Sequence, residues 1–465
     1  MFNDDEAGDE YFEGNLSEDL NKFEVFLKGE AIGFLDSDRW EVLIDHFLLS
    51  GQFKNAALCA EEALTQFSFN SLFKLRKAQA YSALGKLKDA INIITELERA
   101  GEISLEITLT KASIFSQLRD TKNAIRFFKE ALSLADEESR DDIYLDLSME
   151  YQNQNDYKSA LNVLKEAIRV NPNNESAIYE IAFCYDQLED FESSIKCYSD
   201  FIDENPYSFT AWYNLGNAYS KIDNYEKAIW AYDYCILIND DFGPVYFNIA
   251  NSFLSINKYT KAIESFHKCI ELDGDDSVAF CYIGECHEQL NELDLAKHFY
   301  NKSLELEPLL PDAWLGLGIV KDLEGDTKGG LILIKKALEL DPENAGIYHV
   351  LAGAFEKLEM FGEASENYEI SLAMDPSDEE CLSNYIALLS LESGITALSY
   401  LEAFESSSNA IIPVLRVALV WRLGDKGLAL ELFRDAVEND REKAKEIFEL
   451  YPDLKSVKEL IDLSE

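Results

Sequence analysis

A period of thirty-four residues runs through most of this chain, and it restricts the possible folds more than any other feature of the sequence. In residues 209–242, aromatic, leucine and small residues hold fixed places, and similar residues hold the same places one period later and one period earlier. These places are occupied by Trp212, Leu215, Gly216, Tyr219, Ala228 and Tyr232; then by Tyr246, Ile249, Ala250, Phe253, Ala262 and Phe266; and earlier by Ile178, Ile181, Ala182, Tyr185 and Tyr198. A fixed period of this length is typical of repeat proteins, in which each repeat completes its core by stacking on its neighbours.

Each period divides into two predicted helices. Apolar residues return at intervals of three and four, and polar turns such as residues 152–156 separate the two halves of a repeat. We therefore expect three repeats over residues 37–138 and, after two extra residues between Ala135 and Arg140, seven repeats in unbroken register over residues 141–378. Five repeats close on proline, which stops a helix, at one equivalent place: Pro172, Pro206, Pro308, Pro342 and Pro376.

The pattern changes at both ends of the chain. Residues 1–14 are acidic and poor in apolar side chains, so we expect a disordered lead there, and residues 15–36 are expected to form a helix that caps the first repeat. Beyond Asp378 the spacing degrades. Two degenerate repeats are expected over residues 379–441, followed by capping helices over residues 442–465.

Composition narrows the possible partners. The formal net charge is -47, from 41 basic and 88 acidic residues, so no broad basic face is available to neutralise nucleic-acid phosphates. Neither a signal-peptide pattern nor an uninterrupted run of about eighteen apolar residues occurs, which argues against a membrane anchor. The eight cysteines lack paired short spacings and suit reduced, buried thiols. We therefore expect a cytoplasmic protein that binds neither nucleic acid nor membrane.

The repeated order of aromatic, Leu, Gly or Ala, Tyr, Ala, aromatic, Ala and Pro resembles the tetratricopeptide-repeat pattern, over about three quarters of the chain. The chain is similar to an acidic array of the bacterial type within that superfamily. The resemblance implies an all-α fold, a right-handed superhelix or α-solenoid of about ten regular helix pairs. It also implies that the first helix of each pair lines a concave groove and that the second helix lies on the convex back.

The resemblance further indicates which residues face the groove. Counted from the first residue of each repeat, the fifth and ninth places carry Tyr179, Phe183, Tyr213 and Phe247. Their rings would form an apolar, partly aromatic patch. They either contact a ligand or pack against the neighbouring first helices, and the sequence leaves both readings open.

Four asparagines occupy matching places in two consecutive repeats: Asn214 and Asn217, then Asn248 and Asn251. Asparagine is unfavourable inside a helix by roughly 0.5 to 0.7 kcal/mol relative to alanine. Its repetition on one side of a helix therefore indicates a role other than helix stability. Its amide offers one acceptor and two donors, which match the main chain of an extended peptide. We therefore predict a peptide-binding groove. The alternative is that these amides hydrate the groove or bond across adjacent helices.

Acidic residues also stand at places predicted to face the groove, among them Asp186, Glu285, Glu288 and Asp322. By charge complementarity, the predicted ligand is an extended segment that is basic or amphipathic. The family's clamp for a C-terminal carboxylate uses Lys and Arg on successive first helices, and the fifth places carry neither. Because the whole chain is acidic, a solvated acidic surface without a ligand is the alternative.

No catalytic, cofactor-binding or metal-binding pattern stands out. The five histidines are scattered, and neither a glycine-rich phosphate loop nor a nucleophile elbow occurs. Cys281, Cys286 and His287 are close in sequence, but a step of five residues turns about 140° away from a shared helical face.

We therefore predict a non-catalytic interaction scaffold or adaptor, or a chaperone-like protein, that binds an extended peptide of another protein. The alternatives are a structural component that forms homo-oligomers through its end repeats and, less favoured, an enzyme.

Overall fold

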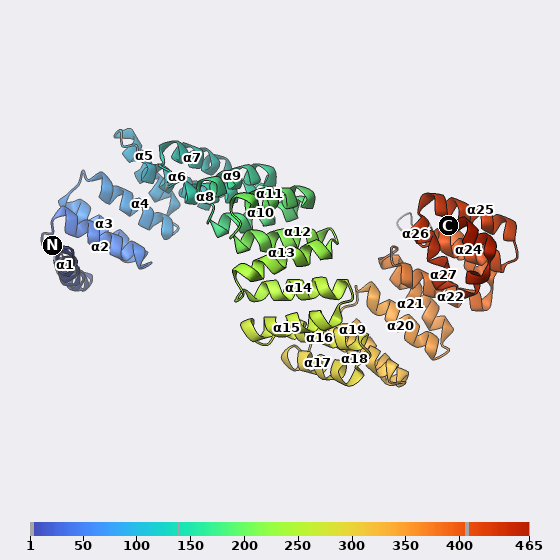
Figure 1. Ribbon diagram of the computed structural model, residues 1–465. Helices are drawn as coiled ribbons and strands as arrows, with labels where there is room; N and C mark the ends of the chain where they lie inside the picture. Colours follow the sequence, from blue (N-terminus) through green and yellow to red (C-terminus); the bar gives the residue numbers. More distant parts are fainter. Residues whose placement is uncertain (1–3, 138, 405–408, 465) are drawn as a thin grey trace. The chain divides into compact units, whose positions relative to one another are not determined.

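The structure is a computed structural model, and it describes residues 4–137, 139–404 and 409–464. Over these residues the secondary structure consists of helices, with no strand. The chain divides into two compact bodies, an N-terminal half (residues 1–238) and a C-terminal half (residues 239–465). The predicted all-α array of helix pairs is confirmed (Figure 1).

The N-terminal half begins with helix α1 (Asp4–Leu27) and continues as consecutive helix pairs (Figure 1). The two helices of a pair pack against each other, and the second helix also packs against the first helix of the next pair. The pairs are α2 (Ser37–Leu49) with α3 (Phe53–Gln66), α4 (Ser71–Ala83) with α5 (Leu87–Arg99), α6 (Leu105–Gln117) with α7 (Thr121–Leu134), α8 (Arg140–Gln152) with α9 (Tyr157–Val170), α10 (Glu175–Leu188) with α11 (Phe191–Glu204), and α12 (Phe209–Lys221) with α13 (Tyr225–Ile238).

The C-terminal half repeats this arrangement and then departs from it. Its pairs are α14 (Gly243–Ser255) with α15 (Tyr259–Asp273), α16 (Ser277–Gln289) with α17 (Leu293–Leu306), α18 (Pro311–Leu323) with α19 (Thr327–Leu340), α20 (Ala345–Lys357) with α21 (Phe361–Met374), α22 (Glu379–Glu392) with α23 (Gly394–Ala403), and α24 (Ile412–Arg422) with α25 (Lys426–Asn439). Short elements follow: α26 (Arg441–Lys445), α27 (Ile447–Leu450), the 3-10 helix η1 (Pro452–Ser456) and α28 (Lys458–Ser464).

The turn between the two helices of a regular repeat contains one residue in the left-handed backbone region. These residues are Gly51, Gly85, Arg119, Asn155, Glu189, Asp223, Asn257, Asn291, Gly325 and Glu359, with φ between 51° and 90°. They follow one another at thirty-four residues, apart from one step of thirty-six between Arg119 and Asn155. The longer step spans the two extra residues, which lie in the connection between α7 and α8. The period in the sequence therefore corresponds to one backbone conformation repeated along the chain.

Small residues allow the helices of a pair to approach closely. A side-chain carbon placed on Gly216 of α12 would lie 2.3 Å from the ring of Tyr232 on α13. That ring is fully buried, so it has no space into which to move. Ala228 and Ala231 of α13 are also completely buried. Glycine and alanine therefore occur in the repeat pattern where two helices are in close contact.

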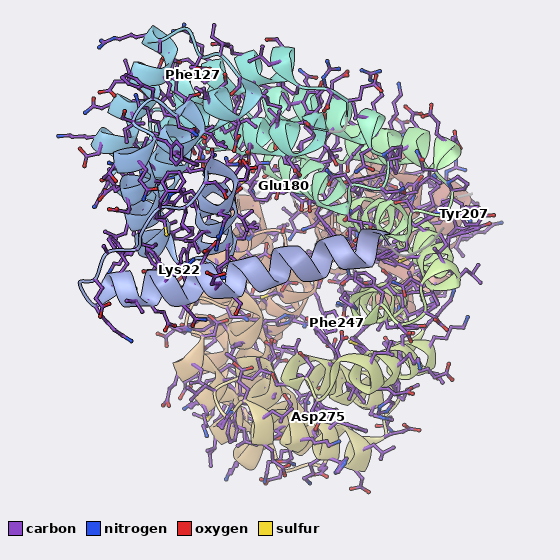
Figure 2. All side chains as sticks on the ribbon, turned by 90° about the vertical axis from the view of Figure 1, so that its left-hand side faces the viewer. Lys22, Phe127, Glu180, Tyr207, Phe247 and Asp275 are labelled. Carbon is purple, nitrogen blue, oxygen red and sulfur yellow. The ribbon has the colours of Figure 1, made fainter. Side chains whose placement is uncertain are left out.

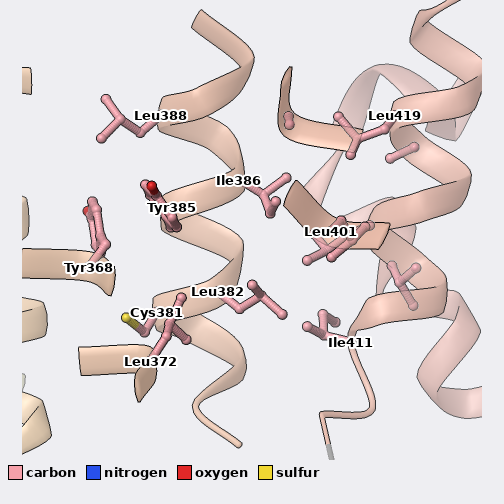
Figure 3. Close-up of a cluster of buried hydrophobic side chains, with 14 of the residues drawn as sticks. Tyr368, Leu372, Cys381, Leu382, Tyr385, Ile386, Leu388, Leu401, Ile411 and Leu419 are labelled. Atoms are coloured by element: carbon pink, nitrogen blue, oxygen red, sulfur yellow. The ribbon is translucent and has the colours of Figure 1, made fainter. Parts of the chain in front are cut away.

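Beyond the regular repeats, α22 has apolar side chains on two sides. Figure 3 shows Leu382 and Ile386 of α22 facing Leu401 of α23 and Ile411. On the other side, Cys381, Tyr385 and Leu388 face α21, which carries Tyr368 and Leu372. A helix that is apolar around much of its circumference is buried between neighbours. Helix α22 is therefore buried between α21 and α23.

Helix α1 packs against α2 of the first repeat, and its backbone is helical from Asp4. Phe23 is buried against Phe47 of α2, with 4.9 Å between ring centres, and Asp19 pairs with Arg39 of α2. Figure 2 marks this helix by Lys22. The proposed boundaries between lead, cap and repeats stay predictions.

Candidate functional site

The first helices of neighbouring repeats contact one another directly within each half of the chain. These contacts join α2 with α4, α4 with α6, α8 with α10 and α10 with α12 in the N-terminal half, and α16 with α18 and α18 with α20 in the C-terminal half. In each half we call the surface formed by these helices the first-helix face. It is the surface on which the sequence places the predicted groove residues.

The first-helix face of the N-terminal half is hollowed between α4, α6 and α8. The hollow has a volume of about 800 Å³, and its walls include Gln79, Leu109 and Thr110. Three carboxylates, those of Glu106, Asp142 and Asp146, line it, and no lysine or arginine is among its described lining residues. Burial, together with the nearby charges of Asp142 and Glu150, raises the pKa of Asp146. The hollow is therefore an acidic depression open to solvent.

Two aromatic side chains are exposed on α10, next to this hollow in the array. Tyr179 is 40% exposed and Phe183 is 45% exposed. Phe183 meets Tyr157 edge to face at 6.1 Å, and Met149 of the neighbouring helix α8 is 54% exposed. Apolar side chains so exposed on consecutive first helices form a patch that water solvates poorly. The prediction that these residues bind a ligand stays a prediction.

The predicted groove residues on α12 are in different environments. The ring of Tyr213 lies 6.1 Å from that of Tyr232. The side-chain oxygen of Asn217 accepts a hydrogen bond of 2.8 Å from the Tyr232 hydroxyl. Asn214 is only 3% exposed, and its side-chain nitrogen has no hydrogen-bond partner among the described residues. The structure therefore places Asn214 beneath the surface, whereas the sequence analysis expected it to line an open groove.

In the C-terminal half, α14 carries the remaining predicted ring and amides. Phe247, labelled in Figure 2, packs against Phe266 of α15 at 5.5 Å and Tyr282 of α16 at 6.1 Å between ring centres. Asn248 and Asn251 are partly buried on the same helix. The ring of Phe247 therefore packs against neighbouring helices, which was one of the two alternatives for the aromatic residues of the fifth and ninth places.

The four predicted acidic residues are in different local environments. Asp186 is exposed on α10, and Asp322 of α18 forms an ion pair with Lys357 of α20. Glu288 accepts a hydrogen bond of 2.9 Å from Tyr300, and burial raises its pKa to about 7. Burial and the nearby charge of Asp312 likewise raise the pKa of Glu285. These two carboxylates lie together on α16.

Polar side chains connect consecutive first helices along the N-terminal half. Gln79 of α4 donates to Glu106 of α6 at 3.0 Å, and Gln117 of α6 donates to Ser82 of α4 at 2.9 Å. Gln152 of α8 donates to Glu180 of α10 at 2.8 Å. Bonding across adjacent helices was the alternative proposed for the asparagines, and here glutamines perform it. The aromatic and asparagine places of the repeat do not reveal these residues. The signal in the sequence is the recurrence of glutamine in the second half of first helices, at Gln79, Gln117 and Gln152.

The sequence neighbours Cys281, Cys286 and His287 are used for packing. Both thiols are buried, and burial raises the pKa of Cys286 to about 12. The ring of His287 stacks on Phe299 at 5.3 Å and bonds through Nδ1 to Glu292 at 2.7 Å.

Comparison with known proteins assigns the array to a class. Models described as tetratricopeptide repeat match residues 106–138, 151–201, 197–229, 243–276 and 279–308. The matched residues are tetratricopeptide repeats, as the sequence pattern predicts. Repeats of this kind are protein–protein interaction scaffolds, and the fold is typically non-catalytic. A search of curated proteins finds no match.

Several solved structures are similar to this chain. The APC/C hetero-tetramer Cut9–Hcn1 is 15% identical, with 86% of this chain and 98% of that chain covered at a TM-score of 0.44. A tetratricopeptide repeat protein from Parabacteroides merdae is 14% identical, with 54% and 99% covered at a TM-score of 0.46. YrrB, described as having an unusual peptide-binding site, is 20% identical, with 40% and 95% covered at a TM-score of 0.31.

Across the described residues, every helix is too short or too polar to cross a lipid bilayer.

Proposed function

We propose that the first-helix face of the N-terminal half binds an extended segment of another protein, and that the chain acts as a non-catalytic adaptor or chaperone-like scaffold. The observation that carries the proposal is the exposed pair Tyr179 and Phe183 on α10, in the same array of first helices as the acidic hollow of α4, α6 and α8. A ligand that covers both rings removes apolar surface from water. Extended chains suit such a surface because alternate side chains reach the same side.

The carboxylates that line the hollow indicate which kind of segment it would bind. Glu106 is already paired with Arg76, but Asp142 and Asp146 line the hollow without a basic residue among its described lining. A ligand that brings Lys or Arg would compensate the charges of these two carboxylates. Apolar residues between the basic ones would cover Tyr179 and Phe183. The proposed ligand is therefore basic and amphipathic.

Amides have a supporting role in this proposal. Asn217 is partly exposed on α12 of the N-terminal half and would bind the main chain of a ligand. Asn248 and Asn251 of α14 belong to the C-terminal half, and their role in peptide binding stays a prediction from the sequence. Asn214 has no such role, because it is buried. A cytoplasmic location remains a prediction from the sequence.

The test uses a labelled synthetic peptide in which lysine alternates with leucine, and the full chain. Replacing both Tyr179 and Phe183 by alanine should weaken binding about thirtyfold, the equivalent of about 2 kcal/mol, because two anchor rings are lost. Fluorescence anisotropy at low and high salt measures the affinity, which should fall as salt screens the carboxylates.

The matched control is Leu134→Ala, which removes a side chain of similar exposure, 44%, from the second helix α7. It should leave binding unchanged. Equal binding by the double variant, or equal binding of a peptide with glutamate in place of lysine, contradicts the proposal. Self-association of the chain that the peptide does not compete with would instead support assembly through the end repeats.

A further inference from the structure

We propose that His349, Asp378 and Cys381 bind a divalent transition-metal ion of the zinc class where α20 meets the start of α22. The three residues offer one nitrogen, one oxygen and one sulfur atom, and these atoms all lie within 4.8 Å of one another. Among the described residues, this is the group of His, Cys, Asp and Glu side chains that meets this criterion.

The carboxylate is already oriented toward the imidazole. One oxygen of Asp378 caps α22 by accepting the backbone N–H of Cys381 at 2.8 Å. The other oxygen lies 3.3 Å from Nδ1 of His349. Ligand atoms of a tetrahedral zinc ion lie about 3.5 Å apart, given bond lengths of roughly 2.0 to 2.3 Å. The nitrogen and oxygen therefore have nearly the required separation, and the sulfur lies within 4.8 Å of both.

The chemistry of the three groups suits a doubly charged ion. A thiolate and a carboxylate together carry two negative charges, and a neutral imidazole adds none, so a divalent ion is neutralised. Nitrogen, oxygen and sulfur are all zinc ligands. Three protein ligands leave the fourth position of the ion to water.

A neighbouring amide supports the imidazole. The side-chain nitrogen of Asn384 lies 3.0 Å from Nε2 of His349. With the amide turned over, its oxygen accepts the Nε2 proton, which leaves the lone pair of Nδ1 for the ion. Metal-binding histidines usually have such a partner on the other ring nitrogen.

Apolar neighbours enclose the sulfur side of the group. Figure 3 shows Cys381 projecting from α22 beside Leu372 and near Tyr368 of α21, and all three side chains are buried. The ring of Tyr368 is also 6.0 Å from that of His349. An apolar wall of this kind strengthens the interaction of an ion with its ligands by excluding water.

The experiment titrates the full chain with Co²⁺, whose bonds to thiolates absorb in the near ultraviolet, and then displaces it with Zn²⁺. One equivalent of Co²⁺ should produce the thiolate absorption, and Zn²⁺ should abolish it. Cys381→Ser should lose the band. Asp378→Asn should weaken it, and this variant keeps α22 capped because asparagine is as good a cap as aspartate.

Cys59→Ser is the matched control, since Cys59 is equally buried in α3, outside the group. It should keep the band and its intensity. Circular dichroism without metal shows whether each variant is folded. Absence of the band in the native chain, its survival in Cys381→Ser or its loss in Cys59→Ser would overturn the proposal, and the group would then be an ion pair beside a buried thiol.

Discussion

Helix α10 of the N-terminal half and helices α14 and α16 of the C-terminal half use the fifth place of the repeat differently. In the N-terminal half, Tyr179 on α10 is 40% exposed. In the C-terminal half, Phe247 on α14 packs between Phe266 and Tyr282, and Cys281 on α16 is only 5% exposed. The same place in the repeat therefore carries exposed or packed side chains, depending on the residues that the next helices contribute.

The hydrogen bonds made by polar side chains of the first helices also differ between the two halves. Cross-helix bonds from glutamines accompany an open acidic hollow in the N-terminal half. In the C-terminal half, tyrosines of second helices hold carboxylates of first helices: Tyr300 bonds Glu288 and Tyr368 bonds Glu356, at 2.9 and 3.0 Å. The N-terminal face is therefore the better candidate for binding, because these C-terminal carboxylates already have hydrogen-bond donors within the chain.

The largest expected effect separates the two kinds of aromatic residue. Phe247→Ala should lower the free energy of unfolding by about 2 to 3 kcal/mol, because the ring leaves a void against Phe266 and Tyr282. Phe183→Ala should cost less than about 1 kcal/mol, because that ring is half exposed. Urea unfolding followed by circular dichroism measures both. Equal losses of unfolding free energy in the two variants would contradict the distinction between a packed Phe247 and an exposed Phe183.

A smaller effect tests the packing of Tyr300, which holds Glu288. A side-chain carbon on Gly316 of α18 would lie 2.2 Å from this buried ring, so Gly316→Ala should destabilise the chain by about 2 kcal/mol. Gly353 of α20 has no atom within 4 Å of such a carbon. Gly353→Ala should stabilise the chain by about 0.5 to 1 kcal/mol, since alanine favours a helix over glycine. Thermal melts of the two variants should therefore shift in opposite directions, and shifts in the same direction would contradict the packing described.

The smallest effect concerns pH. Burial raises the pKa of Glu288 to about 7, the nearby charge of Glu285 adds to this, and the bond from Tyr300 opposes it. The folded chain therefore keeps a proton on Glu288 that the unfolded chain, with a pKa of 4.5, has already lost. This contribution to stability is full below about pH 4.5 and is lost as the pH rises through about 7.

Glu288→Gln should accordingly raise the melting temperature at pH 8 and reduce the difference between pH 6 and pH 8. Glu305→Gln, at an exposed position of α17, removes the same charge without burial and serves as the control. A pH dependence identical in both variants would show that general charge repulsion, and not Glu288, is responsible.

The fold was predictable from the sequence because its period reflects a local rule. Glycine or alanine must stand where helices touch, as at Gly216, and the turn residues recur with the same backbone conformation. The site was less predictable, because exposure depends on neighbours that the period does not specify. Asn214 and Phe247 occupy the expected places on their helices, yet one is buried and the other is packed between rings. The group formed by His349, Asp378 and Cys381 escaped notice because its members come from successive repeats and share no sequence motif.

Arg76 of α4 is held by carboxylates from the helices on either side: its Nε lies 2.6 Å from Asp45 of α2, and Nη1 pairs with Glu106 of α6. Solenoids can fray from their ends one layer at a time. If the first repeat detaches, Arg76 loses its partner Asp45, and if the third repeat detaches, it loses Glu106. In either case a mostly buried guanidinium keeps only one of its two carboxylate partners. Arg76 therefore couples the first three layers, because the loss of either outer layer also removes one of its two ion pairs.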